Sequence, residues 1–471
     1  MTLHKPSDPS HAHHADNHPS TAEIQKLDNA HHLHPFTVHH ELREQNPRVI
    51  SKAKGVYLWD NDGNRIIDGM AGLWCTQIGY GVEELAEVAS RAMNNLSYYN
   101  TFFQTTTPAV AELGALVASK LPAGFNQLFF ANSGSEANDS AIKLIKYYWN
   151  LKGQPQKKAI ISRDRSYHGT TMGAASLTGL PFMHDIFDLP LEGIHHIGPT
   201  PHFYEYGTDG ESEDAFAARC AQALEDKILE LGPENVAAFI GEPVMGAGGL
   251  MLPPTGYWQK IEAICRKYDV LLWSDEVICG FGRTGSWFGC QTYGYTPDII
   301  TMAKGMSSGY VPISAVALSD EIAGTISDAD TEMAHGFTYS GHPMCCSVSI
   351  RNIQLMDEWD LVGERGKQTA AHFQACLASL EDHPIVGHTR GVGMLGAIEL
   401  VADKETQARF EPDGHAGMTC RGHCFDTGVV MRAVGDTMFL SPPLVMTPGE
   451  IDEMFRLIRT SLDLTAQSLS A

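Results

Sequence analysis

Two residues able to do acid–base or covalent chemistry stand at the ends of apolar runs in the middle of the chain. Residues 270–273 are followed closely by Asp275, and residues 299–302 by Lys304. Short apolar runs bounded by polar residues are typical of buried strands. The carboxyl ends of parallel strands would place this carboxylate and this amine at the edge where open α/β sheets bind ligands.

A buried carboxylate and a buried amine each cost free energy unless a partner compensates the charge. Pyridoxal 5'-phosphate (PLP) compensates both, because its aldehyde bonds to a lysine and its protonated ring nitrogen pairs with a carboxylate. We therefore expect Lys304 and Asp275 to be catalytic residues of a PLP site. Taken singly, Lys304 would be interpreted as a solvated surface lysine, and Asp275 as a turn or helix-capping aspartate.

A second feature suits the phosphate of the same cofactor. The apolar residues 128–130 predict a short strand, residues 131–135 form a small polar turn, and Glu136 is expected to open a helix. A turn at a helix N-terminus presents free backbone N–H groups and the positive end of the helix dipole. Ser133, Gly134 and Ser135 are therefore the predicted phosphate site.

Three other motif matches are judged coincidental. Residues 280–285 and 391–396 match the dinucleotide-binding fingerprint, and residues 305–309 match the nucleophile elbow of serine hydrolases. Both motifs require a helix directly after the turn. The residues that follow are not helical in pattern, so we expect neither function. A serine hydrolase or a non-catalytic binding protein remains the alternative that predicts no cofactor.

Strand and helix patterns alternate through the central part of the chain. Strands are expected at residues 159–161, 236–240, 270–273 and 299–302, and helices at residues 83–93 and 108–120. This alternation predicts a mostly parallel sheet covered by helices on both faces. Tyr167, His168 and Glu242 follow strands closely and are expected at the same ligand-binding edge.

The two ends of the chain differ from its centre. Residues 1–23 form a His-rich tail expected to be disordered, and residues 24–75 include a hairpin with its turn at residues 60–64. Residues 76–344 are the expected large cofactor-binding domain. Residues 345–471 combine amphipathic helices with strands near residues 393–400, 428–431 and 438–440, and are assigned with residues 24–75 to a smaller α+β domain.

The chain of 471 residues carries a formal net charge of −23 without any block of Lys or Arg. Nucleic acid and anionic membrane surfaces are therefore not expected as partners. No run of about 18 apolar residues and no signal-peptide pattern appears, which favours a cytoplasmic protein. Ten cysteines show no paired zinc spacing, so we expect reduced thiols and no metal site.

Seven segments together resemble the class III PLP-dependent aminotransferases of fold type I. They are AGLWC (71–75), NSGSEAND (132–139), YHG (167–169), GEPVMGAGG (241–249), SDEVICGFGRTG (274–285), AKGMSSGY (303–310) and HGFTYSGHP (335–343). The resemblance extends from His31 to the C-terminal helix. It is strongest to the omega-amine:pyruvate group, and within it to putrescine–pyruvate aminotransferases. It implies a large domain with a mostly parallel seven-stranded sheet and a smaller domain built from both termini.

The resemblance also implies roles for the cofactor residues. Lys304 would bond to PLP and move the proton between substrate carbon and cofactor, while Asp275 would keep the ring nitrogen protonated. Tyr167 and Val277 would cover the two ring faces, and Glu242 would lie near the ring hydroxyl. The remaining cofactor residues are His168, Phe337 and Thr338. Thr338 would reach the phosphate of the neighbouring subunit, which implies a homodimer, alone or paired into a tetramer.

The substrate pocket implied by the resemblance is lined by Phe36, Trp74, Phe102, Tyr167 and Ala247. Arg432 matches a mobile arginine that grips the pyruvate carboxylate with two parallel hydrogen bonds and swings away for a substrate without a carboxylate. The sequence departs from the family pattern at Met245, where Gln is usual, and at residues 164–166, where Asp-Arg-Ser replaces Trp-Asn-Gly.

The expected reaction moves the amino group of a primary amine, such as putrescine, cadaverine or an aryl-alkyl amine, to pyruvate. It would give alanine and an aldehyde or ketone by a ping-pong mechanism. Two alternatives within the same fold remain. One is a β-alanine or other omega-amino acid:pyruvate aminotransferase, and the other is a PLP aminomutase or decarboxylase.

Overall fold

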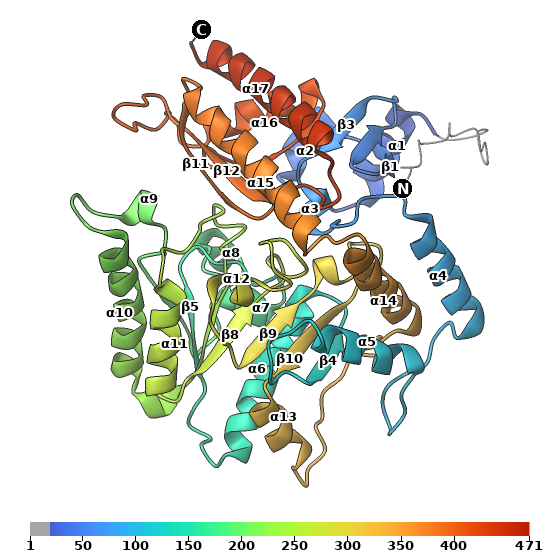
Figure 1. Ribbon diagram of the computed structural model, residues 1–471, viewed down its shortest axis with the longest axis vertical. Helices are drawn as coiled ribbons and strands as arrows, with labels where there is room; N and C mark the ends of the chain where they lie inside the picture. The colour runs from blue at the N-terminus through green and yellow to red at the C-terminus, as the bar shows by residue number, and fades with distance from the viewer. Residues whose placement is uncertain (1–18, 471) are drawn as a thin grey trace.

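A seven-stranded sheet forms the centre of the computed structural model, which describes residues 19–470 (Figure 1). In spatial order its strands are β4 (Gln127–Ala131), β10 (Ser314–Leu318), β9 (Ile299–Met302), β8 (Leu271–Asp275), β7 (Val236–Gly241), β5 (Ala159–Arg163) and β6 (Ile194–Ile197). Strands β9, β8, β7, β5 and β6 are parallel neighbours, and β10 runs antiparallel to both β9 and β4. The prediction of a mostly parallel sheet is confirmed.

Alternate side chains of the sheet enter two separate apolar layers, as the period of two in a strand requires. In β8, Leu271 and Trp273 pack on the layer formed with α6 (Gly134–Leu151), whereas Leu272 packs on the opposite layer. The opposite layer is formed with α10 (Glu213–Leu231) and α11 (Tyr257–Lys267). Because both faces are covered, the central strands are apolar over most of their length, as residues 271–273 of β8 show.

Other helices surround this sheet. They are α7 (Met172–Leu177), α8 (Pro181–Asp185), α9 (Phe203–Tyr206), η1 (Pro233–Asn235), α12 (Gly289–Tyr293), η2 (Lys304–Met306) and α13 (Asp320–Ser327). Preceding the sheet in the chain are α4 (Glu83–Asn95) and α5 (Pro108–Ala118), against which α14 (Pro343–Glu358) packs.

Two four-stranded sheets lie with the terminal helices at one end of the molecule (Figure 1). One contains β1 (Ile50–Lys54), β2 (Tyr57–Asp60), β3 (Arg65–Asp68) and β13 (Val429–Val430), so it joins the two ends of the chain. The other contains β11 (Val386–Val392), β12 (Leu395–Leu400), β15 (Thr437–Leu440) and β14 (Arg432–Val434). The helices here are α1 (Thr21–His31), α2 (His39–Gln45), α3 (Ala71–Trp74), α15 (Glu364–Ala378), η3 (Ser379–Asp382), α16 (His415–Thr427) and α17 (Pro448–Ser470).

Several predicted boundaries differ from the structure. Helix α1 begins at Thr21, inside the expected tail, because Ser20 and Glu23 form a reciprocal capping box; residues 1–18 lie outside the described part. Of the expected strand at residues 428–431, only Val429 and Val430 form a strand, β13, and the chain enters β14 of the other sheet at Arg432. The segment predictions also missed β6 and β11, whereas the predicted hairpin is confirmed by β2 and β3. The domain boundaries at residues 75 and 344 stay a prediction.

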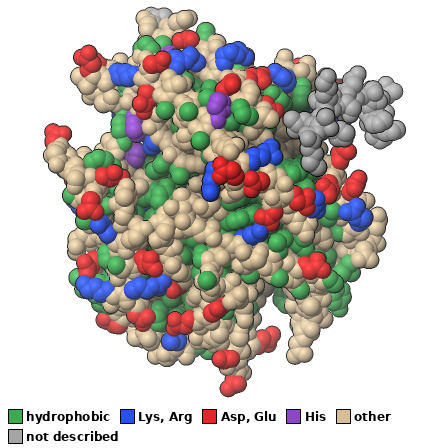
Figure 2. Space-filling model, in the orientation of Figure 1, with side chains coloured by type: hydrophobic (Ala, Val, Ile, Leu, Met, Phe, Trp, Pro, Cys, Tyr) green, Lys and Arg blue, Asp and Glu red, His purple; other side chains and the backbone are tan. Residues whose placement is uncertain are grey.

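Acidic and basic side chains are interspersed over the face drawn in Figure 2, with acidic groups in excess over the chain. Among residues 19–470, no helix combines the length and the apolar character needed to cross a membrane.

Candidate functional site

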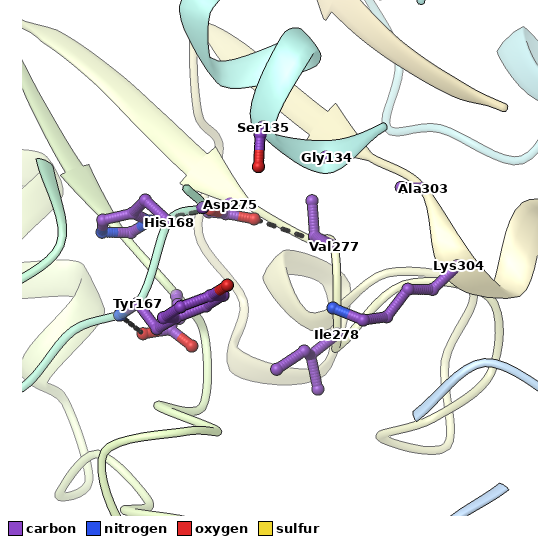
Figure 3. Close-up of a pocket in the computed structure, with 11 residues that line it drawn as sticks. Gly134, Ser135, Tyr167, His168, Asp275, Val277, Ile278, Ala303 and Lys304 are labelled. Carbon is purple, nitrogen blue, oxygen red and sulfur yellow. Dashed lines mark hydrogen bonds and ion pairs between the residues drawn. The ribbon is translucent and has the colours of Figure 1, made fainter. Parts of the chain in front are cut away.

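The carboxyl ends of β8 and β9 open into one cavity. Asp275 is the last residue of β8, and Lys304 lies two residues beyond β9. In Figure 3 the Lys304 side chain extends into this space, with Tyr167 and Ser135 around it. The lining residues are Gly134, Ser135, Tyr167, His168, Gly169, Glu242, Asp275, Val277, Ile278, Ala303 and Lys304. The structure therefore brings together the carboxylate and the amine from which the sequence interpretation began.

The Asp275 carboxylate is held by three neighbours, and the residue is only 3% exposed. The Asn138 amide donates to Oδ2 at 2.9 Å, and His168 Nδ1 lies 2.7 Å from the same oxygen. The backbone N–H of Val277 donates to Oδ1 at 3.0 Å. These contacts fix the orientation of a buried charge that can pair with a protonated ring nitrogen.

Lys304 occupies a strained part of the backbone map, with φ at +40°. Non-glycine residues with this geometry are uncommon and often mark functional sites. Burial lowers the pKa of the Lys304 amine, although the nearby acidic groups, Cys75 first, oppose the shift. A lowered pKa increases the share of neutral, nucleophilic amine at neutral pH.

Helix α6 begins at the edge of the cavity, as the phosphate prediction requires, but it starts at Gly134 rather than at Glu136. The Ser133 hydroxyl accepts the N–H of Glu136 at 3.2 Å, so Ser133 is the N-cap and does not line the cavity. A Cβ on Gly134 would lie 3.0 Å from a Val277 methyl group, which shows how closely the helix end approaches the cavity wall. Gly134 and Ser135 leave first-turn N–H groups for a phosphate.

Glu242 connects the Tyr167 segment to the loop after β7. Its Oε1 accepts the Tyr167 N–H at 3.1 Å, and its Oε2 accepts the Gly246 N–H at 3.0 Å. Burial raises the pKa of Glu242 and also that of the Tyr167 hydroxyl. The Tyr167 ring lies across the cavity in Figure 3. Its flat face and the Val277 side chain are suited to the two sides of a planar ring.

These residues fit PLP. The amine of Lys304 can bond to the aldehyde, and the buried carboxylate of Asp275 can hold the ring nitrogen. The start of α6 at Gly134 can bind the phosphate. The Asp275 carboxylate is buried and oriented by Asn138 and His168, so it offers a fixed acceptor to a protonated ring nitrogen in the cavity.

Other predicted site residues lie outside this lining. Trp74 is buried, and the Arg432 guanidinium carbon lies 5.4 Å from its ring centroid. Arg432 is the first residue of β14. Phe36 is 69% exposed. The Thr338 carbonyl accepts the Tyr98 hydroxyl at 2.8 Å.

The remaining predicted residues also stand apart from the lining. Ala247 is buried in the loop after β7, and the Phe102 ring lies against Gly336, one residue before Phe337. Phe337 packs near the rings of Phe129 and His335.

The sequence interpretation missed Asn138, Gly169, Ile278 and Ala303. Asn138 is fully buried beside the apolar residues Ala137 and Ala141 of α6. A buried amide among mostly apolar residues of a helix is a usable signal, because such a group requires a hydrogen-bond partner.

The structure also shows where the three coincidental motif matches lie. Residues 391–396 belong to the β11–β12 hairpin, and no helix follows residues 305–309 before β10. After residues 280–285 the next helix is the short α12, which begins at Gly289. None of the three has the strand–turn–helix context that its motif requires.

Comparison with known proteins gives concordant matches. A family model described as aminotransferase class-III matches residues 39–462. A putrescine–pyruvate aminotransferase from Pseudomonas aeruginosa is 50% identical over 452 residues, which cover 96% of this chain and 98% of that protein. A mitochondrial gamma aminobutyrate transaminase 1 from Solanum lycopersicum is 42% identical, covering 91% of this chain and 84% of that protein.

A solved structure of an omega transaminase from Pseudomonas jessenii, in complex with PMP, superposes with a TM-score of 0.93 at 41% identity. It covers 95% of this chain and 99% of that chain.

Proposed function

Because the chain belongs to the class III aminotransferases, which use PLP, we propose that it transfers the amino group of a primary amine to pyruvate. The proposal that pyruvate is the acceptor rests on the position of Arg432. Its guanidinium lies over the Trp74 ring and close enough to Tyr167 to affect the pKa of the phenol. A guanidinium at this place can bind a carboxylate with two parallel hydrogen bonds.

When bound, PLP supplies an aldehyde that bonds to amines and a ring that withdraws electrons from the substrate carbon. With PLP bound, Lys304 would take the proton from the substrate carbon, a role that suits an amine with a lowered pKa. Asp275 would pair with the protonated ring nitrogen, and Asn138 and His168 keep its carboxylate in position.

The ring of Trp74 offers Arg432 a second place when the substrate has no carboxylate. A cation over an indole face is attracted to the ring, by roughly 0.5–2 kcal/mol depending on exposure. The site can therefore accept pyruvate and then a carboxylate-free amine without leaving a charge unpaired. Putrescine is the proposed donor, supported by the similarity to the Pseudomonas aeruginosa enzyme.

A second candidate donor class is the omega-amino acids. The similarity to gamma aminobutyrate transaminases supports it, and Arg432 could bind the carboxylate of such a donor as well as that of pyruvate.

A homodimer is proposed to complete the site. The predicted phosphate residue Thr338 does not line the cavity of its own chain. Large apolar side chains near it and in the N-terminal part are exposed: Leu33, Phe36, Leu73, Phe103 and Tyr339. Exposed apolar groups of this kind are typical of protein interfaces. A cytoplasmic location is proposed as well, supported by ten cysteines that form no disulfide.

The test is a panel of donors with pyruvate as the acceptor and alanine as the measured product. Putrescine, cadaverine, an aryl-alkyl amine, β-alanine and gamma-aminobutyrate would be compared by kcat/KM. Higher values for the diamines support the proposal, and higher values for the amino acids favour the second candidate. Absence of alanine with every donor would overturn both.

A further inference from the structure

The loop at residues 246–250, called here the pocket loop, lies directly behind two residues of the cavity wall. Its Gly246 N–H donates to Glu242 Oε2 at 3.0 Å. A Cβ on Gly246 would lie 2.5 Å from Ile278 Cδ1, so the loop backbone packs against Ile278. Glu242 and Ile278 both line the cavity. A shift of the pocket loop would therefore move the wall.

Arg165 holds this loop from the large-sheet side. Its Nη2 donates to the Gly248 carbonyl at 2.8 Å, and its Nη1 donates to Glu205 Oε2 at 2.6 Å and to the Tyr206 hydroxyl at 3.0 Å. A Cβ on Gly248 would lie 2.0 Å from the Arg165 carbonyl oxygen, so the two backbones are in direct contact. Arg165 also stands two residues before Tyr167, which ties the loop to the aromatic wall.

Arg390, in strand β11 of the four-stranded sheet that also contains β14, binds the same loop. Its Nη2 donates to the Gly249 carbonyl at 2.5 Å, and its Nε donates to the Leu250 carbonyl at 2.7 Å. Its Nη1 lies 2.7 Å from Glu399 Oε1. Two guanidinium groups thus bind three consecutive carbonyls, at residues 248–250.

A guanidinium usually binds a carboxylate or a phosphate. Here the guanidinium groups of Arg165 and Arg390 each also donate hydrogen bonds to main-chain carbonyl oxygens. Each keeps a carboxylate of its own, Glu205 or Glu399, which offsets the repulsion between the two cations. The nearby His202 is buried, and its pKa falls to about 2 because of burial and then of Arg390 and Arg165. It stays neutral at working pH and adds no third charge.

We propose that Arg165 and Arg390 are positioning residues that clamp the pocket loop between the large sheet and the smaller one, and so set the size of amine that the site accepts. This inference rests on the proposed function. The clamp keeps the buried Ala247 and the Ile278 wall in place, which favours slender donors over bulky ones. Residue 165 is Arg where the family usually has Asn. This departure makes the clamp possible, because only a long cationic side chain could contact both Glu205 and the Gly248 carbonyl.

The test compares Arg165→Met, Arg390→Met and the double variant with the wild-type holoenzyme. Arg409→Met is the matched control. Arg409 pairs with the same Glu205 at 3.4 Å and is 59% exposed, but it makes no hydrogen bond to the pocket loop among the described residues. The measurements are kcat and KM for putrescine and for a bulky aryl-alkyl amine, with pyruvate as the acceptor, and the melting temperature.

Each clamp variant should change the ratio of the two kcat/KM values by about tenfold in favour of the bulky amine, the size expected for one charge-assisted hydrogen bond. The KM for putrescine should change more than kcat. In the double variant, the ratio of the two kcat/KM values should change by less than the product of the two single-variant changes, because both residues hold the same loop. Arg409→Met should leave the ratio unchanged.

An unchanged ratio in folded, active clamp variants would overturn the clamp and leave the proposed function intact. A wild-type protein that forms no alanine from any amine would overturn the proposed function itself. If Arg390→Met does not fold, Arg390→Lys replaces it, because lysine keeps the charge but reaches one carbonyl. It should shift the ratio in the same direction by a smaller factor, and a ratio equal to that of the wild type counts against the clamp.

Discussion

The Asn138 amide and the Asp275 carboxylate form a hydrogen bond of 2.9 Å between the first helix after β4 and the end of β8. The same amide nitrogen also donates to the His168 carbonyl at 2.6 Å. One buried side chain therefore holds both the carboxylate that is predicted to face the ring nitrogen and the segment that carries Tyr167.

Replacing Asn138 by Ala should weaken this arrangement without removing a group that does chemistry. We expect kcat to fall and PLP to bind about tenfold or more weakly, because a hydrogen bond to a charged group contributes about 1.5–3 kcal/mol. PLP binding can be followed by equilibrium dialysis. Ser140→Ala is the matched control, since Ser140 lies on the same helix but contacts the Glu136 carbonyl and His335 rather than Asp275. Equal losses in both variants would show that Asn138 only stabilises the helix.

Asp275→Asn should preserve the shape of the site and remove its charge. The ring nitrogen would then lose its proton more readily, and each pKa unit lost costs about 1.4 kcal/mol. The half-reaction with amine should slow markedly while part of the PLP stays bound, as stopped-flow absorbance can show. Asp275→Glu retains the charge and should recover part of the rate. An unchanged rate in Asp275→Asn would mean that the carboxylate is structural.

Lys304→Ala should fold and hold PLP without a covalent bond. Turnover should fall by about 100-fold or more, because the bond to the cofactor and the proton transfer are both lost. Mass spectrometry after borohydride reduction reports the covalent bond, and alanine formation reports turnover. Lys304→Arg keeps the positive charge and should be equally inactive. Near wild-type activity in either variant would contradict the role of Lys304.

Arg432→Ala should raise the KM for pyruvate strongly. The expected factor corresponds to about 2–4 kcal/mol, from a charge-assisted pair of hydrogen bonds. The half-reaction with a carboxylate-free amine should change much less, and it can be followed as loss of the visible absorbance of the cofactor when amine is added alone. Arg421→Ala removes a neighbouring positive charge and should leave the KM for pyruvate near its wild-type value. Equal slowing of both halves would show that Arg432 holds the site together.

Glu276 predicts a dependence of stability on pH. Burial raises the pKa of this carboxyl from 4.5 to about 7, against the opposing hydrogen bonds from Cys290 and Gly289. The folded state therefore binds a proton more tightly than the unfolded state. The stability that the protonated Glu276 carboxyl contributes is fully present below pH 4.5 and is lost as pH rises through about 7. The loss amounts to about 3 kcal/mol at most.

The comparison is between urea unfolding of the wild-type protein and of Glu276→Gln at several pH values from 5 to 8. The variant should be less stable at pH 5, because an amide cannot accept both N–H groups. Its stability should also fall less between pH 5 and 8. Parallel curves for the two proteins would contradict the raised pKa.

Local patterns predicted the parts of the fold that depend on local physics. The ends of β8 and β9, the hairpin of β2 and β3, and the helix after β4 all follow from apolar periodicity and turn residues. Strand β6 was missed because its four residues include two histidines, His195 and His196, which break the apolar run.

The remaining site features depend on pairing between distant segments. Asn138 was missed because a helical pattern treats every buried position as apolar. The contact of Arg165 with Gly248 requires a backbone approach across 83 residues, which no local spacing encodes. The resemblance to a known family provided Thr338 and Arg432, and the roles of both stay predictions.

The crossing of the chain between the two small sheets determines how Arg432 can move. Val430 pairs in parallel with Asp68 in one sheet, Met431 follows, and Arg432 pairs with Phe439 in the other sheet. The main chain is therefore anchored on both sides of this arginine within three residues. Its guanidinium can change place only by rotation about its own side-chain bonds, among a few staggered rotamers. When the Arg432 guanidinium moves from a substrate carboxylate to the Trp74 ring, we therefore expect a change of side-chain rotamer without any rearrangement of the backbone. Side-chain NMR of a labelled Arg432 would follow this change.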